Sequence, residues 1–367
     1  MIQSILRQMK IGSKTLGLEI TDSHIKICET ESKRKDVPHI LKYATGVLQE
    51  GIVRDGKILN MELLHTAIKN LINEHKFSSK NVHFAIPSQM VMVRNLKLPD
   101  LSHHELKKLV QFEIKNNLAV AFEHPHYDFI KLPKKVAKET EKRPSMLKKL
   151  LNKNLGASPE QTEEPSEDHL CDVLVVAAPM DMLREYSEMF ASLKLVPRSY
   201  EIKPFSILRL LEKSPIESTG LTILLDVNEA NSELTIVEDG IFKITRNVEI
   251  SFKALQPNTT EDNNQWISEF TSPEHTFVSA AEDLISEIER LMNFYYYTLN
   301  KGNVQFDSIM VSGSIANMEI LVKALEQRMT QRIVAIDWMS LEVANHSAHW
   351  SVSSYAVSLG LALRGSD

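Results

Sequence analysis

Hydrophobic and polar positions along this chain repeat with two different periods, which predicts an alternation of helices and strands. Residues 60–77 place six apolar residues on one face at helical spacing, namely Leu63, Leu64, Ala67, Ile68, Leu71 and Ile72. Residues 16–30 and 221–250 instead contain short apolar runs separated by polar turns, as strands do. The pattern therefore indicates an α/β protein.

The remaining segments extend this interpretation. Further helices are expected at 102–120, 180–195, 204–213, 278–299, 318–329 and 353–365. Strands are expected at 126–132, 171–179, 196–203, 308–314 and 333–336, and residues 81–99 alternate like two paired strands. Ser102 followed by Glu105 matches the capping pattern of a helix start.

Composition limits the class of protein. The chain has 367 residues, enough for two or three domains, and its net charge of −6 gives no reason to expect nucleic acid as a partner. The cysteines, Cys28 and Cys171, are too few for a disulfide framework, which fits a reducing compartment. No apolar run is long enough to cross a bilayer.

Two segments depart from the alternation. Residues 134–169 begin rich in lysine and arginine and become acidic, with Ser, Pro and Gln between, which predicts a solvated charged insertion. Residues 1–10 have an apolar helical face formed by Ile2, Ile5, Leu6 and Met9. That face suits a membrane surface or a partner, although a docked or frayed terminus is the simpler interpretation.

A similar sequence pattern occurs in both halves of the chain. "LGLEITDSHIKI" and "ILLDVNEANSELTIV" are each an apolar strand with an acidic residue near its end, a polar turn and a second strand. Such duplication fits two α/β lobes around a cleft. Backbone N–H groups of tight turns bind phosphate, and strand-end acids hold a hydrated metal ion, so a nucleotide would lie between the two hairpins.

The order of these turns resembles that of the actin-like ATPase superfamily, and the chain is most similar to the type IV pilus assembly protein PilM family. The resemblance covers most of the chain outside 134–169 and about 255–277. It rests on these stretches: "LGLEITDSHIKICE", "GVLQEGIVRDGKI", "NVHFAIPSQMVMVRNLKLP", "ELKKLVQFEIKNNLAVAFEHPHYDF", "VLVVAAPMDMLREYSEMF", "LLDVNEANSELTIVEDGIFKITRNVEI", "EIERLMNFYY" and "YAVSLGLALR".

The resemblance implies a domain plan. Residues 14–80 would begin a first actin-like lobe, completed by about 199–215 and by a helix at 350–364. Residues 81–198 would be an inserted small α+β subdomain, which contains the charged segment 134–169. Residues 216–349 would form the second lobe.

The resemblance also implies a nucleotide site whose motifs are altered here. The family has Asp-Ile-Gly in the first hairpin and Asp-x-Gly in the second, where this chain has Glu19-Ile20-Thr21 and Asp226-Val227-Asn228. Paired glycines at the sugar and base turn are replaced by Ser312-Gly313-Ser314. Thr21 is β-branched and disfavours positive φ, whereas Asn228 tolerates it. We therefore expect weak or absent binding of ATP and Mg²⁺, and no catalysis.

If ATP does bind, the residues expected to hold it come from both hairpins and the third turn. They are Gly17, Glu19, Thr21, Asp22, Ser23, Lys26, Asp226, Asn228, Ser232, Ser312, Gly313 and Ser314. Glu19 and Asp226 would then be the metal-binding acids.

The function implied by the resemblance is that of a cytoplasmic adaptor at the inner face of the membrane, in a type IV pilus-like or competence machine. Its partner would be the cytoplasmic tail of a PilN-like inner-membrane protein, and through it the assembly ATPase and platform protein. Self-association remains open. The alternative is an ATP-binding actin-like protein with ATPase or polymerising activity, similar to FtsA or to a kinase, which requires an intact phosphate site.

Overall fold

The computed structural model describes residues 13–32, 39–133, 169–217, 219–252, 273–300, 304–337 and 351–365. The predicted apolar helical face of residues 1–10 and the predicted charged segment 134–168 lie outside these ranges. Most of 255–277 also lies outside them. The chain divides into a larger unit (1–92, 122–126 and 177–367) and a smaller one (93–121 and 127–176).

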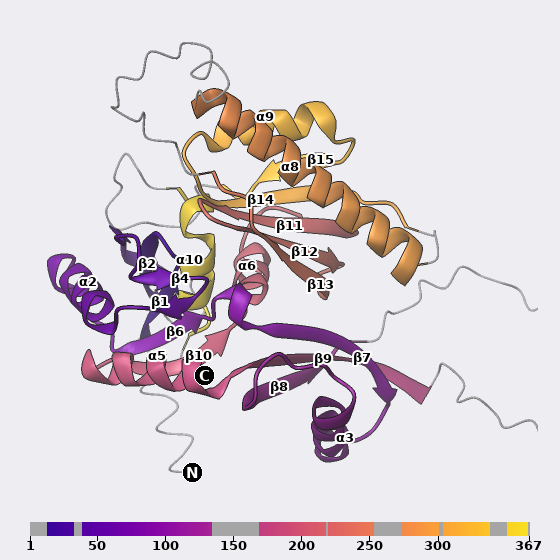
Figure 1. Cartoon of the computed structure of the whole chain (residues 1–367), viewed down its shortest axis with the longest axis horizontal. Coiled ribbons are helices and arrows are strands. Elements are labelled where there is room, and N and C mark those ends of the chain that lie inside the picture. Colours follow the sequence, from indigo (N-terminus) through magenta and orange to yellow (C-terminus); the bar gives the residue numbers. More distant parts are fainter. Residues whose placement is uncertain are drawn as a thin grey trace, which may run out of the picture. The chain divides into compact units, whose positions relative to one another are not determined.

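The larger unit contains two five-stranded sheets of the same design (Figure 1). The first has the order β10–β6–β1–β2–β3: β1 (Ser13–Ile20), β2 (His24–Ser32), β3 (His39–Val47), β6 (Asn81–Ala85) and β10 (Val196–Glu201). The second has the order β13–β12–β11–β14–β15: β11 (Leu221–Asn228), β12 (Ser232–Glu238), β13 (Ile241–Val248), β14 (Ser308–Ser314) and β15 (Arg332–Ala335).

In each sheet an antiparallel hairpin is followed by a parallel strand. β1 pairs antiparallel with β2 and parallel with β6, and β11 pairs antiparallel with β12 and parallel with β14. The similarity between the two hairpin sequences therefore corresponds to a structural duplication. The predicted fold class, a duplicated actin-like α/β fold, is confirmed.

Helices cover both faces of the first sheet. α2 (Met61–Glu74) and α5 (Met180–Ser192) pack on one face, and α6 (Lys203–Glu212) and α10 (Ala356–Ala362) pack on the other. Strand alternation decides which side chains meet which helices. Leu16, Leu18 and Ile20 of β1 belong to the cluster with α2 and α5, so the residues between them face α6 and α10.

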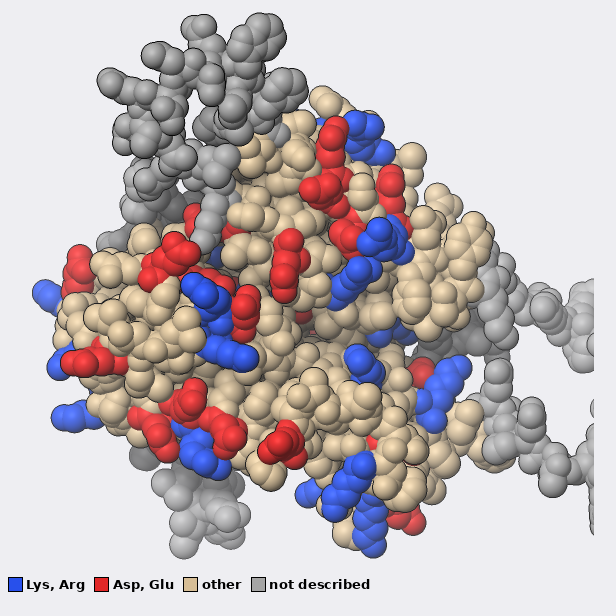
Figure 2. All heavy atoms as spheres, viewed as in Figure 1, with Lys and Arg blue, Asp and Glu red and all other residues tan. Residues whose placement is uncertain are grey.

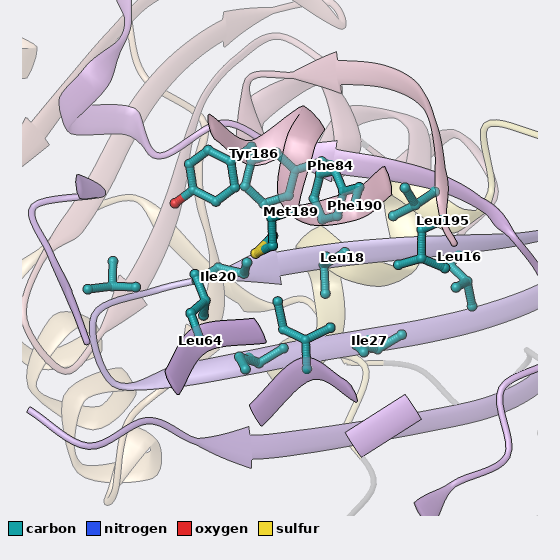
Figure 3. Packing of buried hydrophobic residues seen from close by; sticks show 14 of the residues in the cluster. Leu16, Leu18, Ile20, Ile27, Leu64, Phe84, Tyr186, Met189, Phe190 and Leu195 are labelled. Carbon is teal, nitrogen blue, oxygen red and sulfur yellow. The ribbon is translucent and has the colours of Figure 1, made fainter. Parts of the chain in front are cut away.

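An aromatic group forms the centre of the core between β6 and α5 (Figure 3). The Phe84 ring lies 4.6 Å from that of Tyr186 and 5.3 Å, edge-on, from that of Phe190. The Tyr186 hydroxyl donates to Gly56 O at 3.2 Å, so its one polar atom is satisfied. Burial raises the pKa of Tyr186.

The second sheet is covered on one face by α8 (Pro273–Phe294), which continues as a π-helical turn at Tyr295–Leu299, and by α9 (Met318–Arg328) (Figure 1). Its other face shares a core with α6 and α10, which includes Leu224, Val237 and Met310. α6 and α10 therefore pack against both sheets.

α10 packs closely against its neighbours because a glycine lies at two of the contacts, Gly17 of β1 and Gly360 of α10 itself. A Cβ on Gly17 would lie 1.8 Å from Ser358 O, and a Cβ on Gly360 would lie 2.0 Å from Ser206 O of α6. The hydroxyls of Thr15 and Thr30 donate to Ala362 O at 2.6 and 2.8 Å. They therefore satisfy a carbonyl group at the C-terminal end of α10 that has no partner within the helix. α10 is thus fixed to the first sheet by backbone-level contacts.

Smaller elements complete the larger unit. The hairpin of β4 (Val53–Arg54) and β5 (Lys57–Ile58) turns at Asp55-Gly56, where both residues have a positive φ. Single 3-10 turns occupy Ser88–Met90 and Ser353–Tyr355.

The smaller unit contains a three-stranded sheet and one helix in the described residues. The strands, in the order β7–β9–β8, are β7 (Met92–Pro99), β9 (Leu170–Pro179) and β8 (Pro125–Lys131), and the helix is α3 (His103–Asn116). Ser102 N donates to Glu105 Oε2 at 3.1 Å, so the capping box is present. The Ser102 hydroxyl lowers the pKa of Glu105.

Two expectations differ from the structure. Residues 81–99 do not form a pair of strands, because β6 joins the first sheet and β7 the three-stranded sheet, with the 3-10 turn between them. The smaller unit is also narrower than the predicted 81–198, because β6 and β10 pair in parallel within the first sheet.

We expect Gly17→Ala to lower the free energy of unfolding by roughly 3 kcal/mol, because the backbone of α10 cannot yield to the added methyl group. Gly46→Ala is the matched control. Its Cβ would meet the flexible Leu71 side chain at 3.3 Å, and we expect a change within about 1 kcal/mol. Urea denaturation measures both, and equal losses would contradict the close contact.

Glu201 at the end of β10 gives a prediction about pH. Burial alone would raise its pKa, but Arg209 and Arg364, at 2.8 and 2.6 Å from its carboxylate oxygens, lower it below the ordinary value. A carboxylate with a lowered folded-state pKa contributes stability above its unfolded-state pKa of about 4.5 and loses it as the pH falls further.

We therefore expect Glu201→Gln to be about 2–4 kcal/mol less stable than the wild type at pH 7. The difference should shrink as the pH falls below about 4.5. Denaturant titrations of both proteins across this range measure it. A difference that does not change with pH would show that the charge of Glu201 is not what stabilises the fold.

Candidate functional site

The first predicted phosphate hairpin is a tight turn closed by its own side chains. Thr21 N donates to His24 O at 2.9 Å, and Thr21 Oγ1 accepts from His24 N at 3.0 Å. Hydroxyl groups commonly support turns in this way. Among the described residues, neither Thr21 nor Asn228 has a positive φ, so the strain that a missing glycine was expected to cause is absent.

Asp22 and Ser23, the other residues of this turn, bind within the chain. Asp22 Oδ2 accepts from Asp55 N at 3.0 Å, and its Oδ1 accepts from Gly56 N at 3.4 Å. Ser23 Oγ lies 2.8 Å from His24 Nδ1. Asp22 thus ties the β4–β5 hairpin to the first turn.

The centre of the site is a group of five buried charged residues, named here the charge cluster. It comprises Glu19, Lys26, Lys203, Asp226 and Glu233. Alternation along β1 and β11 explains why the acids approach each other. Glu19 lies between Leu18 and Ile20, and Asp226 lies between Leu225 and Val227, so both carboxylates are on the sheet faces that meet α6 and α10.

Lys203 joins the two predicted metal-binding acids. Its Nζ lies 2.8 Å from Glu19 Oε1 and 3.4 Å from Asp226 Oδ2. The exposed fractions are 2% for Glu19, 5% for Lys203 and 4% for Asp226, so these charges are shielded from water. A single ammonium group therefore connects one strand of each sheet.

The pKa values of the cluster residues reflect this ion pair and their burial. Burial would lower the pKa of Lys203, but Glu19 and Asp226 raise it above its ordinary value. Burial would likewise raise the pKa of Asp226, but Lys203 and Lys26 lower it. Burial raises the pKa of Glu233.

The second hairpin and the third turn donate hydrogen bonds to the same carboxylate. Asn228 Nδ2 donates to Asp226 Oδ2 at 2.9 Å, and Ser312 Oγ donates to Asp226 Oδ1 at 3.1 Å. The structure thus brings Asp226, Asn228 and Ser312 together as predicted, but these residues satisfy one another.

The two candidate glycines have packing roles. Gly17 faces α10, as described above. Gly313 has φ +121°, and a Cβ there would lie 2.0 Å from Val227 O of the adjacent strand. Ser312, Gly313 and Ser314 are the last residues of β14, so the turn expected at this motif lies just beyond it, ending at Asn317 with φ 63°.

Ser232 is the remaining candidate. It begins β12 and is fully buried, and its Oγ has no hydrogen-bond partner in the described part of the chain.

The metal ion that the fold family implies does not fit the residues as they stand. The ammonium group of Lys203 already lies between Glu19 and Asp226, where a divalent cation would bind. Across the described ranges, no group of three His, Cys, Asp or Glu side chains has an arrangement suited to a metal.

Sequence reasoning missed Lys203. The available signal was its position as the first residue of α6, directly before Pro204. A cation is unfavourable at a helix N-terminus unless carboxylates offset it, so a lysine there indicates acidic partners from elsewhere in the chain.

The distribution of charge can be followed on one face of the described residues. On the face shown in Figure 2, basic and acidic side chains are interspersed rather than collected into one basic area. None of the helices in the described ranges has the length and apolar character needed to span a bilayer.

Comparison with known proteins identifies the class of fold. A search of solved structures matches one from the "PilM-PilN type IV pilus biogenesis complex" with a TM-score of 0.73 and 19% identity, over 96% of this chain and 98% of that one. The ethanolamine utilization protein EutJ from Carboxydothermus hydrogenoformans matches with a TM-score of 0.47 and 9% identity, over 96% and 90% of the two chains. The first of these matches shows that the chain shares the fold of that PilM chain, and the two duplicated sheets agree with the predicted actin-like ATPase fold.

Within that class, residues 17–149 match the family described as type IV pilus assembly protein PilM. The predicted resemblance to the PilM family is thus confirmed. No curated protein sequence matches the chain.

The contacts of Asp22 indicate that its carboxylate stabilises the β4–β5 hairpin, and hydrogen exchange can test this role. We expect Asp22→Ala to speed hydrogen exchange at the Asp55 and Gly56 amides about tenfold, since about 1.4 kcal/mol of hydrogen bonding is lost. Asp22→Asn is the matched control, because it keeps an acceptor oxygen. Unchanged exchange in Asp22→Ala would leave this carboxylate free for another role.

Proposed function

We propose that this chain is an adaptor in the assembly of a type IV pilus-like machine, and that it binds the cytoplasmic tail of a PilN-like inner-membrane protein. The observation that carries the proposal is the structural match over nearly the whole chain to a solved PilM–PilN complex. The family match over residues 17–149 supports it independently. Through this partner the chain acts at the inner face of the membrane and contacts the assembly ATPase and platform protein indirectly.

We propose further that the adaptor works without ATP. The proposal is supported by the contacts of the residues that a nucleotide would need, because these residues already bind other parts of the chain. Asp22, Asn228 and Ser312 bind within the chain, and Lys203 pairs with both candidate metal-binding acids. Binding Mg-ATP would require breaking these contacts before new ones form.

The alternative, an ATP-dependent enzyme or polymer related to FtsA or to a kinase, keeps the same fold. It requires phosphate and metal between the two hairpins, where buried side chains now pair with one another. The charge cluster therefore favours the adaptor.

Calorimetric titration of the full chain tests the adaptor function. The ligand is a synthetic peptide of the cytoplasmic tail of the PilN-like protein from the same pilus system, and the control is the same peptide with its sequence scrambled. We expect a micromolar dissociation constant for the tail and no binding of the scrambled peptide. If the tail does not bind at millimolar concentration, the adaptor proposal fails.

Repeating the titration with millimolar Mg-ATP tests nucleotide independence separately. We expect the affinity for the tail to change less than threefold, because a ligand that does not bind cannot shift the affinity of another site. A tenfold change, or direct heat from ATP alone, would instead support a nucleotide-gated adaptor.

A further inference from the structure

The interaction between Lys203, Glu19 and Asp226 has a role beyond filling the predicted metal position. We propose that the ammonium group of Lys203 is a permanent internal replacement for a divalent cation, and that it holds the two sheets of the larger unit together without nucleotide. This inference concerns the charge cluster alone and does not depend on the pilus partner.

The geometry fits an ammonium ion. Its Nζ lies 2.8 Å from Glu19 Oε1 and 3.4 Å from Asp226 Oδ2, and both distances are within the range of an ion pair between an ammonium group and a carboxylate. Mg²⁺ would need oxygen ligands at about 2.0–2.1 Å and several waters around it.

The acids need a cation. Two carboxylates that share a buried site repel each other and cannot both remain charged without a compensating positive group. Ser312 and Asn228 donate hydrogen bonds to Asp226 but carry no charge. Lys203 is the cation that contacts both carboxylates in the described residues.

The position of Lys203 in the fold suits a fixed cation. It follows β10 of the first sheet and begins α6, the helix that leads to the second sheet. Pro204 restricts the backbone at the start of that helix. The close contact between Ser206 and Gly360 fixes α6 against α10. The lysine side chain therefore extends from a rigid base.

Two neighbouring contacts also connect the hairpin regions of the two sheets. The Ser88 hydroxyl is hydrogen-bonded to Glu233 Oε2, and His24 Nδ1 lies 4.0 Å from Glu229 Oε2. Lys203 is distinguished from these pairs because it contributes a full positive charge to two carboxylates at once.

The decisive experiment compares the thermal unfolding of the full chain and of Lys203→Met, with and without millimolar Mn²⁺. The substitution keeps the length of the side chain and removes its charge. We expect the melting temperature to fall by about 5–10 °C in Lys203→Met, because two buried carboxylates lose their cation. Mn²⁺ should restore at least half of this loss in the variant and leave the wild type unchanged.

Lys26→Met is the matched control. Lys26 is buried and lies opposite Glu19 in the β1–β2 register, but no contact between its ammonium group and Asp226 is seen in the described residues. Mn²⁺ should not restore its stability. Equal rescue of both variants, or equal stabilisation of the wild type, would overturn the assignment to Lys203.

A charge-free variant keeps the test decisive if Lys203→Met does not fold. The triple variant Glu19→Gln, Asp226→Asn, Lys203→Met removes all three charges and nearly keeps their shapes. We expect it to fold with a melting temperature within about 5 °C of the wild type and not to respond to Mn²⁺. If it is as unstable as Lys203→Met, the packing of the lysine matters rather than its charge, and the proposal fails.

Discussion

The ion pair of Lys203 with Glu19 and Asp226 is the interaction on which the larger unit depends. It joins β1, β11 and the start of α6, and therefore the three parts of the chain that meet between the two sheets. Strand alternation sends both acids inward, and two inward acids require a cation. Once Lys203 supplies it, Asn228 and Ser312 complete the environment of Asp226.

This arrangement shows how a fold can keep the residues of a ligand site and use them internally. An acid at the end of each hairpin strand is the feature from which a nucleotide site is predicted, and this chain has both. Each now contacts the protein itself. Asp22, at the turn, has likewise become the acceptor for two amides of the next hairpin. In the described residues these side chains contact other parts of the chain.

Much of the fold could be predicted from the sequence because its signals are local. The apolar period of 60–77, the capping box at Ser102 and the similarity between the hairpins each appear in the structure. Pairing between strands is not local, and residues 81–99 were therefore wrongly expected to pair with each other. The candidate site could be predicted only in part. Its turns are local features of the sequence, whereas the lysine that pairs with their acids comes from a distant segment.

The glycines show a second limit on what can be predicted from the sequence alone. Gly17 and Gly313 fit a phosphate motif by position, yet each is required by a neighbouring backbone that only the folded chain brings near. Conversely, Thr21 was expected to strain its turn and instead closes it with its hydroxyl. The type of a residue limits the roles that it can have, and the residues that contact it in the folded chain determine which role it takes.

The placement of α10 has a consequence for how the protein is made. This helix covers one face of the first sheet and contributes to the core shared by both sheets, yet it is synthesised after every strand it contacts. A nascent chain that has not reached Ala356 leaves Cys28, Leu224 and their neighbours uncovered. Because domains fold as they emerge from the ribosome, the larger unit must wait for translation to pass α10. Chaperones and proteases would therefore distinguish chains that contain α10 from chains interrupted before it by this apolar surface.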